Sequence, residues 1–182
     1  MKKAYEMLIA GFGGQGVLFG GKLIAEIGLI DGKEVTWMPS YGPAMRGGTC
    51  NCSVVMSDKP IGSPVVLNPE LAIIMNRPSY DKFIGAVKPG GIAIVDSSLS
   101  DAENSPAKPT EGIAVHNIPA TKLAVDNNLV GMANIILIGK MLKVTGLTSE
   151  ETILKAMKFV TEGKEHLFDL NMKALKIGME HN

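Results

Sequence analysis

The feature that most constrains the fold is a glycine-rich segment, GFGGQG at residues 11–16, between an apolar run and a helical pattern. Residues 4–10 read AYEMLIA, which predicts a strand. Residues 17–32 carry apolar side chains at helical spacing and end in a glycine, which predicts a helix and its stop. A strand that enters a helix through so tight a turn is typical of an α/β fold. Gly11, Gly13 and Gly16 fit the pattern G-x-G-x-x-G, and Gly14 is an extra glycine.

Such a turn can serve three purposes, and the sequence leaves all three open. The free N–H groups at the start of a helix favour a bound phosphate or carboxylate, which the glycines let come close to the backbone. A nicotinamide dinucleotide would also need an acidic residue at the end of the second strand. That strand ends in WMPS at 37–40, and its nearest acid, Glu34, stands at its beginning. The third purpose is tight packing alone.

A second glycine-rich segment, YGPAMRGGT at 41–49, is expected to be a loop between two strands. It contains no Asp, Glu, His, Ser or Lys, so it is poorly suited to proton transfer. Arg46 can make a forked contact with a carboxylate or a phosphate, and the neighbouring glycines allow close approach to another surface. The alternative is a merely solvated arginine. The candidate binding residues are therefore Gly11, Gly13, Gly14, Gly16, Tyr41, Arg46, Gly47 and Gly48.

The order of the remaining patterns predicts one domain, residues 1–182. Strands are expected at 33–38, 49–56, 71–76, 91–98 and 112–119, with a short helix after 76 and four helical segments after 120. This order predicts a three-layer α/β/α fold, Rossmann-like, with a helical C-terminal region. Alternation of apolar and polar residues at 49–56 indicates a mixed, mostly parallel sheet.

Two details of the helical region can be predicted. Thr148 and Glu151 have the spacing of a capping box at the start of the third helical segment. The last segment, 164–180, has a wide apolar face that we expect to pack on the domain.

Composition excludes several classes of protein. Lys+Arg and Asp+Glu number 18 each in 182 residues, so there is no electrostatic case for binding nucleic acid. The longest apolar run in the second half, IILI at 135–138, is far short of the roughly 20 residues that span a bilayer. The N-terminal segment lacks the apolar run of a signal peptide, so a cytoplasmic location is expected.

No catalytic or metal-binding group stands out. Cys50 and Cys52 alternate with polar residues along one predicted strand, which indicates small buried side chains. Two cysteines are too few for an iron–sulfur cluster. Ser97 lacks a G-x-S-x-G context, and Asp96, at the end of a strand, either contacts a ligand or caps a turn. No histidine pair has ligand spacing among His116, His166 and His181.

The two glycine segments together carry a resemblance. GFGGQGVLFGGKLIA, then PSYGPAMRGGTCNCSVV and IGSPVV, resemble the gamma subunit of 2-oxoacid:ferredoxin (or acceptor) oxidoreductases over nearly the whole chain. The form is most similar to the 2-oxoglutarate branch, with the branched-chain and pyruvate enzymes behind it. Many relatives of that family carry Glu where this chain has Ala44, so this chain lacks that carboxylate in the loop.

The resemblance implies a part in oxidative decarboxylation of a 2-oxoacid to an acyl-CoA. Thiamine diphosphate and iron–sulfur clusters would then belong to partner subunits, alpha, beta and possibly delta, with ferredoxin or another acceptor taking the electrons. This chain would be inactive alone, with a structural role or a contact to coenzyme A. The alternative is a free-standing Rossmann-like protein that binds a nucleotide or a small anion.

Overall fold

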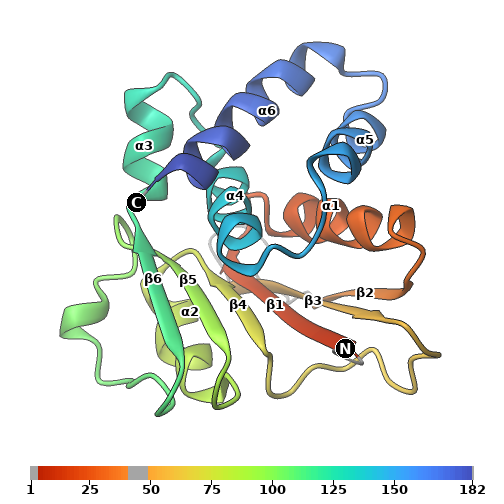
Figure 1. The fold of residues 1–182 in the computed structure, drawn as a ribbon. Coiled ribbons are helices and arrows are strands. Elements are labelled where there is room, and N and C mark those ends of the chain that lie inside the picture. The colour runs from red at the N-terminus through yellow and green to blue at the C-terminus, as the bar shows by residue number, and fades with distance from the viewer. Residues whose placement is uncertain (1–3, 41–48, 182) are drawn as a thin grey trace.

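The structure, a computed structural model, describes residues 4–40 and 49–181. Its centre is a six-stranded sheet in the order β2-β3-β1-β4-β5-β6 (Figure 1). β3 is antiparallel to both neighbours, whereas the pairs β1–β4, β4–β5 and β5–β6 are parallel. The predicted mixed, mostly parallel sheet is therefore confirmed. The strands span Ala4–Phe12 (β1), Glu34–Ser40 (β2), Thr49–Ser57 (β3), Leu71–Ile74 (β4), Ile92–Asp96 (β5) and Ala114–Ile118 (β6).

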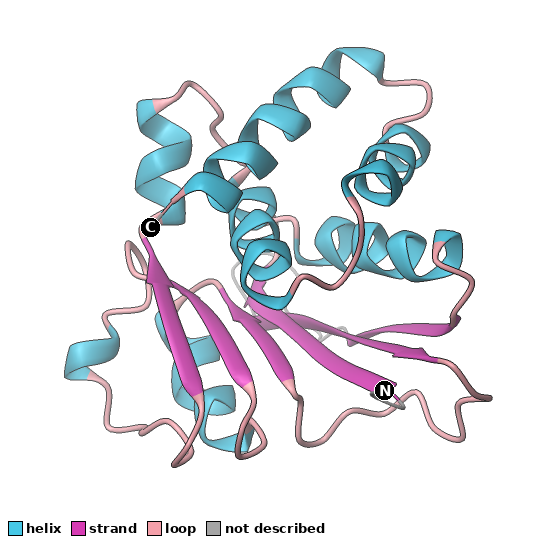
Figure 2. Ribbon diagram, in the orientation of Figure 1, coloured by secondary structure: helices cyan, strands magenta, loops and turns pink. Residues whose placement is uncertain are grey.

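Helices cover both faces of the sheet, but unequally (Figure 2). The thick layer holds α1, α3, α4, α5 and α6, and the other face carries α2 with the short 3-10 turn η1. The predicted three layers are confirmed, and one helical layer is much thinner than the other. The helices span Val17–Ile30 (α1), Arg77–Phe83 (α2), Ala120–Asp126 (α3), Ala133–Thr145 (α4), Glu150–Val160 (α5) and Glu165–Glu180 (α6); the 3-10 turns are Ile84–Ala86 (η1) and Ala102–Asn104 (η2).

The hydrophobic core has two parts, one for each face of the sheet. The larger part joins β1, β3 and β4 to α1 and the C-terminal helices, and the smaller part lies between β4, β5 and α2. β4 supplies Ile73 to the first and Ile74 to the second, which explains its continuous apolar sequence. None of the helices in the described ranges is both long and apolar enough to cross a membrane.

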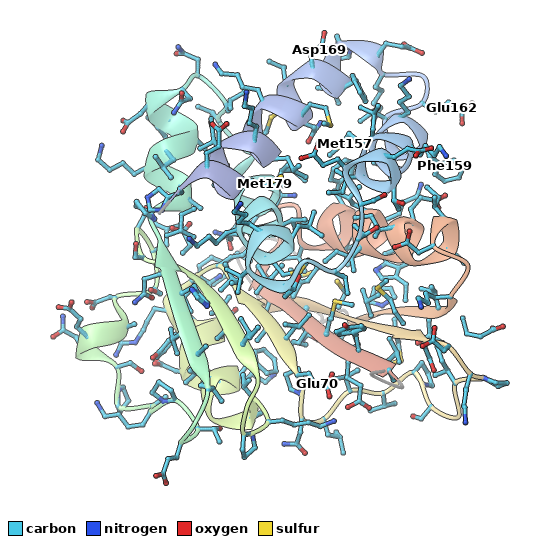
Figure 3. All side chains as sticks on the ribbon, viewed as in Figure 1. Glu70, Met157, Phe159, Glu162, Asp169 and Met179 are labelled. Atoms are coloured by element: carbon cyan, nitrogen blue, oxygen red, sulfur yellow. The ribbon has the colours of Figure 1, made fainter. Side chains whose placement is uncertain are left out.

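The last helix packs as predicted. Phe168, Met172, Leu175 and Met179 all contact the larger core, whereas Asp169 is exposed (Figure 3). A stripe of apolar residues at helical spacing thus attaches α6 to the domain.

The predicted capping box is wrong. α5 begins one residue later, and the side chain of Ser149 accepts the hydrogen bond from the backbone N–H of Thr152. The hydroxyl of Thr148 instead donates to Asp31 at the end of α1, 2.6 Å away. The side chain of Thr148, which the local pattern predicts to cap α5, is thus used in a tertiary hydrogen bond to Asp31.

The chain leaves β1 and β4 in opposite directions. From β1 the chain runs through α1, on one face of the sheet, to β2 at one edge. From β4 it runs through α2, on the opposite face, to β5 toward the other edge. β1 and β4 are parallel neighbours, so their carboxyl ends mark the topological switch point of the sheet. In doubly wound sheets this is the position at which ligands bind.

Candidate functional site

The first glycine segment lies at this switch point. It follows β1 directly, and Met75 and Asn76 follow β4 at the same edge of the sheet. The described residues that flank the second segment, Ser40 and Thr49, lie at the same edge, because Phe12 of β1 pairs with Thr49 and Ser40 of β2 pairs with Asn51. Tyr41, Arg46, Gly47 and Gly48 lie outside the described residues, so their expected role stays a prediction.

The glycines of the turn are there for different physical reasons. Gly11, the penultimate residue of β1, is buried, and a Cβ there would come within 2.8 Å of Oε1 of Gln15 and 3.1 Å of Cβ of Met75. Gly14 has a φ of 95° and open space around it. Gly16 has a φ of 75°, a backbone conformation that residues other than glycine rarely adopt. Gly13 is exposed.

Gly16 is also the N-cap of α1. It offers no side-chain acceptor, and no acidic residue stands in the first turn of the helix. The first N–H groups of a helix have no intrahelical partner, so the start of α1 carries a partial positive charge.

The side chain of Gln15 closes the base of the turn. Its Oε1 accepts hydrogen bonds from the backbone N–H of Phe12 at 2.6 Å and from Nδ2 of Asn76 at 3.0 Å. Its Nε2 reaches the carbonyl oxygen of Met75 at 3.5 Å. Asn76 in turn caps α2 by accepting from the N–H of Ser79. One amide thus joins the carboxyl ends of β1 and β4.

A second amide holds the turn from the helical side. Asn134, near the start of α4 and only 4% exposed, donates from Nδ2 to the carbonyl oxygen of Gly16 at 3.0 Å. A Cβ on Gly16 would lie 2.5 Å from that nitrogen. Gly16 is therefore required by its backbone angles and by the approach of α4.

A pocket of about 190 Å³ opens beside the turn. Its wall is mainly apolar, and the backbone of the glycine turn forms one side. Val125 and Val130 are exposed at 56% and 78%. The lining comprises Gly14, Gln15, Met75, Leu99, Thr121, Ala124, Val125, Val130, Gly131 and Ala133.

Asp96 has a structural task, which decides between its two predicted roles. The carboxylate is fully buried, and it accepts hydrogen bonds from the N–H of Ser98 and from both the N–H and the hydroxyl of Thr121. It therefore caps the turn after β5 and fixes the start of α3. Through Thr121 it also holds one wall of the pocket in place.

The cysteines lie on the face of β3 that points to α1. Cys52 is fully buried, as predicted, and burial raises its pKa to about 12. Cys50 is only half-buried, and the same desolvation raises the pKa of its thiol. Within the described ranges, no group of three or more His, Cys, Asp and Glu side chains is arranged so that it could hold a metal ion. The two thiols, on one strand, do not fit the ligand set of an iron–sulfur cluster.

The structure brings together the four glycines of the turn, and it adds residues that sequence reasoning missed. Gln15 is the only polar side chain in the motif GFGGQG, so the sequence alone could have indicated it as a candidate. Asn76 follows a buried strand, a position where α/β proteins place functional groups. Asn134 lies within an apolar helical pattern, and nothing in the neighbouring sequence indicates that it contacts the glycine turn.

Fold and site define a doubly wound α/β domain with a glycine-rich turn beside a mainly apolar pocket. Residues 6–181 match the family described as pyruvate ferredoxin/flavodoxin oxidoreductase, and the chain belongs to this family.

Two relatives illustrate the range of the family. The 2-oxoglutarate synthase subunit KorC of Methanocaldococcus jannaschii is 33% identical, over 99% of this chain and 95% of its own length. The ketoisovalerate oxidoreductase subunit VorA of Methanothermobacter marburgensis is 38% identical over 94% of this chain. The chain spans only 35% of the length of that VorA subunit.

Solved structures share the fold. The gamma subunit of a keto/oxoacid ferredoxin oxidoreductase from Geobacter sulfurreducens superimposes with a TM-score of 0.82 at 30% identity, covering 98% of this chain and 96% of that one. A 2-oxoglutarate:ferredoxin oxidoreductase from Magnetococcus marinus, with 2-oxoglutarate, coenzyme A and succinyl-CoA bound, gives a TM-score of 0.84 at 22% identity, covering 98% of this chain and 31% of that one. This second likeness is one of fold alone.

Proposed function

We propose that this chain is the gamma subunit of a multi-subunit 2-oxoacid:ferredoxin (or acceptor) oxidoreductase, and that it contacts coenzyme A at the glycine turn. The observation that carries the proposal is the uncapped start of α1 at Gly16 beside an apolar pocket. Coenzyme A combines phosphate groups with less polar parts, and such a site suits both.

The glycine turn would receive a phosphate through backbone N–H groups. Arg46 is the proposed second contact, either to a phosphate of coenzyme A or to a carboxylate of a partner subunit. Thiamine diphosphate and iron–sulfur clusters would be held by the alpha, beta and possibly delta subunits. Among the 2-oxoacids we propose 2-oxoglutarate, because the likeness to KorC spans both chains almost completely.

Reconstitution tests the proposal. The partner subunits are purified with and without this chain, and dye reduction is measured with coenzyme A and each of 2-oxoglutarate, pyruvate and 2-ketoisovalerate. We expect activity only when the chain is present, highest with 2-oxoglutarate, and none from the chain alone. If the partners are fully active without it and the isolated chain binds a nucleotide, it is a free-standing binding protein instead.

A further inference from the structure

The glycine turn faces a physical difficulty as a binding site. Four of its six residues are glycines, and glycine has more backbone freedom to lose on ordering than any other residue. An anion that bound a freely moving turn would have to order it at the moment of binding, which would weaken the affinity. Something must therefore hold the turn in shape before the ligand arrives.

Gln15 has the contacts to do so. The acceptor Oε1 takes hydrogen bonds from Phe12 before the turn and from Asn76 on the neighbouring strand, while the donor Nε2 points to the carbonyl oxygen of Met75. An amide side chain offers an acceptor oxygen and a donor nitrogen on one carbon, so a single residue can make all three contacts. These contacts hold the two ends of the turn to the carboxyl ends of β1 and β4. Gly13 and Gly14, in the middle of the turn, are exposed, and Gly14 lines the pocket.

We infer that Gln15 is a positioning residue, which pre-forms the glycine turn for the phosphate of the bound ligand. This inference rests on the proposed function. The side chain acts through the backbone, because Oε1 accepts from both Phe12 and Asn76, and Nε2 faces the carbonyl oxygen of Met75. Loss of Gln15 therefore costs affinity for the anionic ligand rather than the rate of the chemical step.

The test uses the reconstituted complex and steady-state kinetics with coenzyme A and the 2-oxoacid varied separately. Gln15→Met keeps the length of the side chain and removes all three polar contacts. We expect the KM for coenzyme A to rise about tenfold, with kcat and the KM for the 2-oxoacid unchanged. Gln15→Glu keeps the acceptor but adds a negative charge beside the anion, and we expect a larger rise, about a hundredfold.

Two further variants make the result decisive. Gly14→Ala strains the turn itself at a φ of 95° and should raise the KM for coenzyme A whatever Gln15 does. Asn171→Leu is the control, because it removes a different side-chain amide, a buried one that donates to the carbonyl oxygen of Leu167 at 2.7 Å on α6. It should lower thermal stability about as much as Gln15→Met, with no effect on the KM for coenzyme A.

The outcomes separate the inference from the proposed function. If Gly14→Ala raises the KM for coenzyme A and Gln15→Met lowers only the melting temperature, Gln15 stabilises the fold without affecting ligand binding, and the inference is overturned. It is equally overturned if Gln15→Met lowers kcat and raises both KM values, as general damage would. If neither variant changes the KM for coenzyme A, the turn does not bind that ligand, and the proposed contact itself fails.

Discussion

Gly178 of α6 lies so close to α4 that a Cβ added to it would be 1.9 Å from the backbone oxygen of Ile136. The contact is reciprocal, because a Cβ on Gly139 of α4 would be 2.1 Å from the backbone oxygen of Leu175. Two glycines thus let the two helices touch through their backbones. This crossing attaches the last helix to α4, the helix whose Asn134 holds the glycine turn.

Alanine at either crossing glycine should destabilise the protein. The obstacle to the added methyl group is backbone rather than the end of a flexible side chain, so the helices must move apart. We expect Gly178→Ala to lower the free energy of unfolding by about 1–3 kcal/mol or more, measured by urea denaturation. Gly62→Ala is the control, because nothing lies within 4 Å of that position. Equal stability of the two variants would contradict the close crossing.

The contact between α1 and α5 makes a second prediction. The carboxylate of Asp31 accepts from the hydroxyls of Thr148 at 2.6 Å and Thr152 at 2.8 Å. Asp31→Asn presents one oxygen where there were two, and should cost roughly 1–3 kcal/mol in thermal or urea unfolding. Asp126→Asn breaks only an exposed pair with Lys122 and should cost less than about 1 kcal/mol. A cost for Asp31→Asn as small as this would mean that the hydroxyl contacts add nothing to stability.

Acid should weaken the link between α2 and the segment after β5. The hydroxyl of Ser105 donates to Asp81, and together with Arg77 it lowers the pKa of that carboxyl. A lowered carboxyl pKa adds stability above the unfolded value of about 3.9, and the gain is lost as the pH falls through the folded value. The stability difference between wild type and Asp81→Asn should therefore shrink from pH 6 to pH 3. A difference that is constant over this range would contradict the assigned cause.

The thiols should differ in reactivity. Cys52 is buried, with a pKa of about 12, so almost no thiolate exists at pH 8, and reagents reach it only when the protein opens. In a Cys50→Ser variant, labelling by a disulfide reagent should follow the rate of unfolding. In a Cys52→Ser variant, the half-buried Cys50 should react faster than that. Rapid labelling of native Cys52 would show that α1 does not stay packed on β3.

Arg46 provides the last prediction, from the sequence alone. Arg46→Ala removes the charge, and Arg46→Lys removes only the forked geometry. In the reconstituted complex we expect weaker assembly or a higher KM for coenzyme A, at a cost of roughly 1.5–3 kcal/mol for the alanine variant. The stability of the isolated chain should not change. Gel filtration measures assembly, and dye reduction measures the KM for coenzyme A. If Arg46→Ala behaves as the wild type in both, Arg46 is only a solvated side chain.

Much of the fold could be predicted because its elements are locally encoded. The apolar run at 71–76 and the alternating run at 49–56 became β4 and the antiparallel β3, and the four helical segments after 120 became α3 to α6. Each pattern reports the burial of its own residues, and burial of a continuous face is what stabilises a strand or a helix in the folded chain. The failure at Thr148 shows the limit, since Asp31 is 117 residues away.

By itself, the sequence determined the order of the strands and helices, the glycine turn after the first strand and the absence of a four-cysteine cluster site. These properties depend on residue types and on neighbours a few positions apart. Only the tertiary structure decided what holds the turn: Gln15 meets Asn76 across 61 residues, and Gly16 meets Asn134 across 118. No local pattern encodes such pairs, because a hydrogen bond depends on where the folded backbone places two side chains rather than on their spacing along the chain.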